Sequence, residues 1–369
     1  MLKTFKYRIY PTLKQIREMN QWLEECRWLY NHFLEQRKDA CKQEQRSINY
    51  HAQATSLPEL KGQRPSLNGV HSQVLQNVAV RIDLAFKAFF RRVKAGENPG
   101  YPRFRGKGRY DSFTFPQSGF NLDGDMLRLS KIGSIKVVLH RPIEGNLKIC
   151  TVKRSGTGKW YVTLSVKYEQ DFLPKNDHAV GVDVGLNSFA TLSTGEQTEA
   201  PKFFRKEEKE LAKAQRKLSK AEKGTPERKK CRKVVARVHE RIAWKRQNFA
   251  HQLSRKIVNR FGMIAVEDIH VNRMLHNHCL AKSLSDTAWS GFFQQLAYKA
   301  ACAGRQFVAV NPAYTSQDCS GCGHRQKMPL SERVFNCPCC GMVLDRDHNA
   351  ALNILGLGRQ ALEISPKSP

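Results

Sequence analysis

Three carboxylates in this sequence occupy positions where an acidic side chain has no packing role. Asp183 interrupts the apolar run AVGVDVG, Glu267 ends the apolar run MIAVE, and Asp347 opens the helix-like stretch DHNAALNIL. A buried carboxylate must be paired, hydrogen-bonded or bound to a metal ion. Three such groups converging from two strands and a helix start predict a site for Mg²⁺ or Mn²⁺, which prefer oxygen ligands.

A site of this kind predicts phosphodiester hydrolysis. Two divalent ions about 4 Å apart can activate a water molecule and stabilise the leaving 3′ oxygen during an in-line attack. The products would be a 5′ phosphate and a free 3′ hydroxyl. Asp345 is an alternative third ligand if Asp347 only caps the helix, and we favour Asp347. Asp268, next to Glu267, would face the other side of its strand and cap the following turn.

The cysteines predict a second kind of metal site. Of the eleven cysteines, five fall between residues 319 and 340 and the others are scattered singly. In a reducing compartment this clustering indicates metal binding, and two C-x2-C pairs, each followed by glycine, are typical of a structural zinc site. Cys339 is expected to be a spectator, and His324 is a weaker alternative ligand. The expected zinc ligands are Cys319, Cys322, Cys337 and Cys340.

The charge of the chain indicates a polyanionic partner. The 369 residues include 62 Lys and Arg against 33 Asp and Glu, which gives a formal net charge of +29. Nucleic acid is the usual polyanion that neutralises such a charge. No run of about 18 apolar residues occurs, and the start MLKTFKYRIY lacks the apolar region of a signal peptide, so we expect a cytoplasmic protein with no membrane partner.

Two basic segments are candidates for nucleic-acid contacts. The stretch ENPGYPRFRGKGRYDSF interleaves cations with aromatic rings, so a loop there could present both to a nucleic acid. The second segment runs from about Lys206 to Arg260 and is interrupted near KGTPE, which predicts a hairpin of two basic helices. The predicted contact residues are Arg103, Arg105, Lys107, Arg109, Lys229, Lys230, Lys233 and Arg237.

The remaining patterns predict the elements that must position these residues. Residues 3–10 predict a strand, and apolar periodicity predicts helices after Leu13 and over 74–89. Alternating stretches between 113 and 169 predict a small antiparallel barrel or sheet that the first strand joins. After residue 178, strands alternate with helices, which is typical of an α/β domain.

The order of these motifs resembles the TnpB (OrfB) family of transposon-encoded, RNA-guided endonucleases, relatives of the type V CRISPR effectors. The resemblance runs nearly end to end, although Cys339 is unusual and the residues after Gly358 carry no motif. The motifs that carry it are FKYRIYPT, CRWLYN, YPRFRGKGRYDSF, GVDVGLNSFATLS, IAVEDI, VNPAYTSQDCSGCG, RVFNCPCCG and DRDHNAALNIL.

The resemblance implies an α/β multidomain fold. It combines an RNase H-like (RuvC) nuclease domain, an inserted zinc ribbon that binds target nucleic acid, and a small wedge-like β-barrel that carries a helical recognition insert. Asp183, Glu267 and Asp347 match the family's catalytic positions, the last because the family pattern is D-x-N-A-A. The implied ranges are 1–10 and 111–172 for the barrel, 11–110 for the insert, 173–312 and 344–369 for the nuclease domain with its basic hairpin at about 203–260, and 313–343 for the ribbon.

The resemblance also implies cofactors and partners. These are two Mg²⁺ or Mn²⁺ ions, one structural Zn²⁺, a guide RNA from the transposon end, and double-stranded target DNA next to a short adjacent motif. Pairing with the guide would carry most of the sequence specificity. We expect one protein chain per ribonucleoprotein, in the cytoplasm of a prokaryote.

Two other functions are alternatives. A nuclease-inactive, RNA-guided repressor is disfavoured by the intact carboxylates. A transposase acting directly in strand transfer is disfavoured because the chain lacks a His-hydrophobe-His motif with a tyrosine nucleophile.

Overall fold

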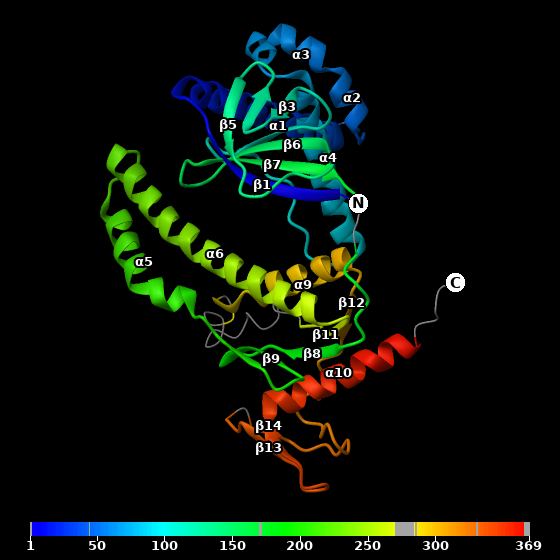
Figure 1. Ribbon diagram of the computed structural model, residues 1–369. Helices are drawn as coiled ribbons and strands as arrows, with labels where there is room; N and C mark the ends of the chain where they lie inside the picture. The colour runs from blue at the N-terminus through cyan, green and yellow to red at the C-terminus, as the bar shows by residue number, and fades with distance from the viewer. Residues whose placement is uncertain are drawn as a thin grey trace. The chain divides into compact units, whose positions relative to one another are not determined.

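The structure is a computed structural model that describes residues 2–43, 45–169, 172–269, 284, 286–329 and 331–364. The chain divides into two compact units, residues 1–169 and 170–369 (Figure 1). Each unit has its own sheet and its own hydrophobic core. No helix in the described part of the chain is long and apolar enough to cross a membrane.

The first unit is built on a seven-stranded antiparallel sheet of order β2-β6-β7-β1-β5-β4-β3. The first strand pairs with β7 along its whole length and with β5 at its end, which confirms that it joins the later strands. The strands are β1 (Leu2–Tyr10), β2 (Ser112–Phe115), β3 (Phe120–Asp123), β4 (Met126–Leu129), β5 (Gly133–Val138), β6 (Asn146–Arg154) and β7 (Trp160–Lys167).

Helices between β1 and β2 complete this core. The two predicted helices are confirmed as α1 (Leu13–Gln43) and α4 (Ser72–Lys94), whose apolar faces pack together with the inner residues of the sheet. The sequence patterns did not predict the short elements between them, α2 (Tyr50–Thr55), α3 (Leu57–Gln63) and η1 (Pro65–Gly69).

The second unit is built on a mixed five-stranded sheet of order β10-β9-β8-β11-β12. β9 pairs antiparallel with both β8 and β10, and β11 runs parallel to both β8 and β12. The strands are β8 (Ala179–Asp183), β9 (Ser188–Leu192), β10 (Gln197–Glu199), β11 (Met263–Glu267) and β12 (Gln306–Val310). The predicted alternation of strands and helices is therefore confirmed.

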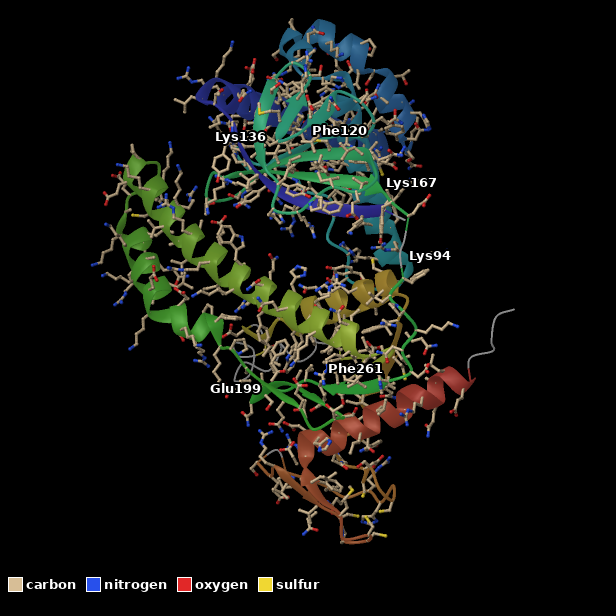
Figure 2. The ribbon with its side chains drawn as sticks, viewed as in Figure 1. Lys94, Phe120, Lys136, Lys167, Glu199 and Phe261 are labelled. Carbon is tan, nitrogen blue, oxygen red and sulfur yellow. The ribbon has the colours of Figure 1, made fainter. Side chains whose placement is uncertain are left out.

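The basic helical hairpin is also present, as α5 (Phe203–Lys220) and α6 (Pro226–Arg260). Leu211, Val238 and Ile242 form the contact between the two helices. The Thr225 hydroxyl accepts from the Arg228 N–H and caps the start of α6, where the sequence predicted a break. Side chains with blue nitrogen tips follow both helices in Figure 2.

Helices cover both faces of the mixed sheet. One face packs against α6 and α9 (Trp289–Ala303), the other against α10 (Arg346–Ile364). Because side chains alternate along a strand, Val182 and Val266 face α6 and α9, whereas Ala265 faces α10. A two-stranded ribbon, β13 (Val334–Asn336) and β14 (Val343–Asp345), leads directly into α10.

Gly181 determines how closely α10 approaches the sheet. A Cβ atom at this position would lie 2.0 Å from the carbonyl oxygen of Ala351 and 2.7 Å from the backbone nitrogen of Leu355. Strand and helix thus meet backbone to backbone, which leaves no room for any side chain between them. This contact fixes the start of α10 relative to the end of β8.

Candidate active site

Asp183 and Glu267 end neighbouring parallel strands. The register pairs Val182 with Val266, so the two acidic residues follow side by side at the same edge of the sheet. Asp183 lies two residues after Gly181 and Glu267 two residues after Ala265, so the side chains point to the same face as those positions. Both therefore lie on the face covered by α10.

Asp347 joins them from the first turn of α10. Its Oδ2 atom lies 3.8 Å from the position that a Cβ atom would take at Gly185, two residues beyond Asp183. The charges of Glu267 and Asp347 both act on Asp183, so the structure places the three predicted carboxylates near one another, from two strands and a helix start.

The electrostatics of Asp183 reflect this convergence. Burial raises the pKa of Asp183 to about 8, and the negative charges of Glu267 and Asp347 add to the effect, with Arg346 opposing it. Carboxylates that lie close together in a buried, poorly solvated site repel one another unless a cation lies between them. The oxygen donors of these three carboxylates fit a hard divalent cation.

Thr315 orients the second carboxylate. Its side chain is 4% exposed, and its hydroxyl donates to Oε1 of Glu267. Burial raises the pKa of Glu267, and the hydroxyl partly offsets this effect. With one oxygen held by Thr315, the other is left for a metal ion.

Asp345 caps α10, the helix whose first turn carries Asp347. The Oδ1 atom of Asp345 accepts from the backbone N–H groups of Asp347 and His348, each at 3.0 Å. These are the second and third residues of α10, the usual targets of an N-cap side chain. The carboxylate of Asp347 lies instead 3.4 Å from Arg346 and 3.8 Å from Arg333. Asp268 is exposed, and its backbone N–H donates to Val310.

The four predicted zinc ligands form one cluster. The sulfur atoms of Cys319, Cys322, Cys337 and Cys340 all lie within 4.8 Å of one another, and the Cys319–Cys340 and Cys322–Cys337 pairs are each 3.6 Å apart. A tetrahedral Zn²⁺ with bonds of about 2.3 Å requires sulfur separations close to these. The cluster includes neither Cys339, which is exposed, nor His324, whose carbonyl oxygen accepts from the Cys319 N–H.

Each C-x2-C-Gly segment of this cluster forms a tight turn, which we call a knuckle. Gly323 and Gly341 follow the C-x2-C pairs with φ of 76° and 71°, a conformation that favours glycine. Their N–H groups donate to the backbone carbonyl oxygens of Cys319 and Cys337 at 2.9 Å. The Cys340 N–H points at the Cys337 sulfur and is the main cause that lowers the pKa of that thiol.

Two asparagines on α10 connect the zinc cluster to the carboxylates. Asn349 is fully buried. Its side-chain amide donates to the Asp318 carbonyl at 2.8 Å and accepts from the Ser320 N–H at 2.9 Å. Ser320 lies between the first two cysteines of the cluster. One turn later, Asn353 donates to the carbonyls of Thr315 and Asp318. We call these hydrogen bonds the asparagine clamp, because they hold the segment from Thr315 to the first knuckle on the helix that carries Asp347.

Thr315, Asn349 and Asn353 carry roles that the sequence patterns did not predict. The one available indication was the pair of asparagines four residues apart on a helix whose other residues are largely apolar. Such spacing places both side chains on one face of the helix.

Replacing Thr315 by Val should weaken metal binding at Glu267. Val keeps the shape but leaves Oε1 of Glu267 without its donor, and a hydrogen bond to a charged group contributes about 1.5–3 kcal/mol. We expect cleavage rates at limiting Mg²⁺ to fall by about 10- to 100-fold, with Thr315→Ser restoring most of the rate. Rates measured across a Mg²⁺ series check this, and a Val variant that needs no more Mg²⁺ than wild type would contradict it.

The predicted nucleic-acid contacts fall into two groups in separate units. Lys229, Lys230, Lys233 and Arg237 are exposed on α6, and Arg103, Arg105, Lys107 and Arg109 are exposed in the loop between α4 and β2. Within the loop, Arg105 and Arg109 line one small pocket, whereas Arg103 lines a different one.

Known families match three parts of the chain. They are described as "Cas12f1-like, TNB domain" over residues 289–354, "Probable transposase" over 163–278 and "Helix-turn-helix domain" over 1–46. In this structure residues 2–43 form one strand and one long helix, without a helix-turn-helix arrangement.

Relatives match almost the whole chain. A Streptomyces pristinaespiralis protein named for RNA-guided DNA endonuclease activity is 36% identical, over 97% of this chain and 90% of its own length. InsQ of Escherichia coli K12, named for the same activity, is 33% identical over 98% of this chain and 93% of its own length. The solved structure of the mini-RNA-guided endonuclease CRISPR-Cas_phi3 has a TM-score of 0.51 at 10% identity, and the match covers 97% of this chain and 92% of that one.

The fold is therefore that of the compact RNA-guided endonucleases. Since a relative with 36% identity matches it over nearly its full length, the chain belongs to the TnpB (OrfB) family of transposon-encoded proteins.

Proposed function

We propose that this chain is an RNA-guided, divalent-metal-dependent DNA endonuclease whose metal ligands are Asp183, Glu267 and Asp347. The observation that carries the proposal is the meeting of two strand-end carboxylates with the first turn of α10. The relatives named for this activity support it.

Each residue of the site has a separate task. When bound, Mg²⁺ or Mn²⁺ ions would supply activation of water and stabilisation of the leaving 3′ oxygen. The adjacent ends of β8 and β11 hold Asp183 and Glu267 at a fixed separation, and Thr315 fixes the rotation of the Glu267 carboxylate. Asp345 satisfies the helix N-terminus, so the Asp347 carboxylate, whose Oδ1 atom lies near Arg346 and Arg333, is not needed as a cap; this supports Asp347 as the third ligand.

The other parts of the chain have proposed roles that follow the family. We assign residues 1–10 and 111–172 to the wedge-like domain, 11–110 to the recognition insert, 173–312 and 344–369 to the RuvC-like nuclease domain, and 313–343 to a ribbon that binds one Zn²⁺. A guide RNA and target DNA are the proposed partners, with one protein chain in a cytoplasmic particle. The division near residue 170 and the four-cysteine cluster support these assignments.

The function is tested by reconstitution. The chain is expressed together with the transposon end, the ribonucleoprotein is purified, and the RNA that accompanies it is sequenced. A plasmid matched to that RNA should be cut in Mg²⁺ and left intact in EDTA or without the RNA. Tight guided binding with no cleavage at any matched site would instead indicate a repressor.

A further inference from the structure

The loop that follows α4 contacts α1 at several residues, and Arg105 makes a paired backbone contact there. It begins beyond Lys94 (Figure 2) and reaches α1 at Arg105, whose backbone N–H and carbonyl both bond to the side-chain amide of Asn31, at 2.7 and 3.0 Å. The Arg27 guanidinium also donates to the Arg105 carbonyl at 3.3 Å. An asparagine that pairs with both backbone groups fixes the position of Arg105 as a neighbouring strand would.

This attachment places the Arg105 guanidinium above a ring. Its central carbon lies 5.3 Å from the centre of the Tyr30 ring, and Arg105 and Arg109 line a pocket of about 240 Å³. A guanidinium stacked on an aromatic face keeps its N–H groups directed outward for a bidentate acceptor.

A third arginine forms part of the same pocket. Arg81 on α4 donates to the Tyr110 hydroxyl at 3.2 Å, to the Ser112 carbonyl at 2.8 Å and to the Thr114 hydroxyl at 2.9 Å. All of these acceptors are uncharged, so they orient the guanidinium without neutralising it.

The pocket therefore carries an excess of positive charge. Within the described part of the chain, none of the three arginines has a carboxylate partner. Asp111 also lines the pocket, but its carboxylate lies 3.3 Å from the Lys153 ammonium on the neighbouring strand. Arginines without a carboxylate partner of their own are arranged for an anionic ligand.

We propose that Arg81, Arg105 and Arg109 form a binding pocket for a backbone phosphodiester of a nucleic acid strand. The pocket has room for a phosphodiester and part of its sugar, and its donors carry no selectivity for a base. The inference rests on the proposed function for the presence of two strands, guide RNA and target DNA, either of which could supply the phosphate.

Binding measurements in EDTA test the pocket independently of cleavage. The probes are the RNA that accompanies the purified wild-type chain, offered to RNA-free protein, and a matched DNA duplex, offered to the assembled ribonucleoprotein. For Arg105→Ala/Arg109→Ala we expect the Kd for one probe to rise by about 10- to 100-fold. The slope of log K against log salt should fall by about 0.7–0.9 for each lost phosphate contact.

Two matched variants make the result specific. Arg105→Lys/Arg109→Lys keeps the charge but loses the planar fork, so it should keep most of the salt slope and lose part of the affinity. Arg128→Ala removes an exposed cation from β4 and should leave both Kd values near wild type.

The two probes also identify the strand. Weaker RNA binding would assign the phosphate to the guide, and weaker DNA binding by a fully loaded particle would assign it to the target. A double-alanine variant that melts like wild type and binds both probes as Arg128→Ala does would overturn the proposal. Failure of the nuclease function would show only in cleavage and would leave these binding results unchanged.

Discussion

Asp183→Asn should abolish DNA cleavage, with a fall in rate of at least about 10³-fold, while guided DNA binding persists. The amide keeps the size of the side chain but removes its charge from the space shared with Glu267 and Asp347, so the site loses much of its attraction for a divalent cation. The measurement is plasmid cleavage in Mg²⁺ by purified ribonucleoprotein, with binding of the same target followed in EDTA. The variant should melt no lower than wild type, because burial disfavours the charged form of Asp183, raising its pKa to about 8, and the amide carries no charge.

Asp345→Asn is the matched control for this site. Asparagine caps a helix about as well as aspartate, so this variant should retain cleavage near the wild-type rate. Asp347→Asn should behave like Asp183→Asn. If the Asp345 variant lost cleavage and the Asp347 variant kept it, the assignment of the third ligand would be reversed.

The second large effect is expected from Cys337→Ser. Cys337 is buried in the zinc cluster, and a structural Zn²⁺ contributes roughly 10–16 kcal/mol of binding free energy to the folding of its module. Loss of that ligand should release the zinc, loosen the ribbon and free the start of α10. We expect the zinc content to fall from one per chain toward zero, and cleavage to drop by at least about 10²-fold.

Cys339→Ser separates this effect from a general sensitivity to cysteine loss. Cys339 is exposed and lies outside the sulfur cluster, so its replacement should leave zinc content and cleavage unchanged. Metal analysis and cleavage of the two variants side by side check the prediction. Equal zinc loss in both would show that Cys339 is a ligand.

The sequence predicted those parts of the fold that depend on local pattern. Apolar runs identified β8 and β11, and a carboxylate inside such a run is conspicuous because burial of a charge is costly. The C-x2-C-Gly repeats identified the four cysteines that cluster for a similar reason, since each C-x2-C-Gly turn is a local structure.

What the sequence could not predict depends on contacts between distant residues. Asp345 and Asp347 both suit the start of a helix, and only the hydrogen bonds of the folded chain show which one caps it. Thr315 lies 48 residues from Glu267, so no local pattern connects them. From the sequence, Asn349 would be taken for an exposed helix residue. In the folded chain it is buried because Asp318 and Ser320, about 30 residues earlier, hydrogen-bond to it.

The asparagine clamp couples the folding of two distant parts of the second unit. Because Asn349 and Asn353 bind the segment from Thr315 to Ser320, the placement of α10, which carries Asp347, and the folding of the four-cysteine cluster support each other. We therefore expect a chain with a disrupted cysteine cluster to hold α10 less firmly against the sheet.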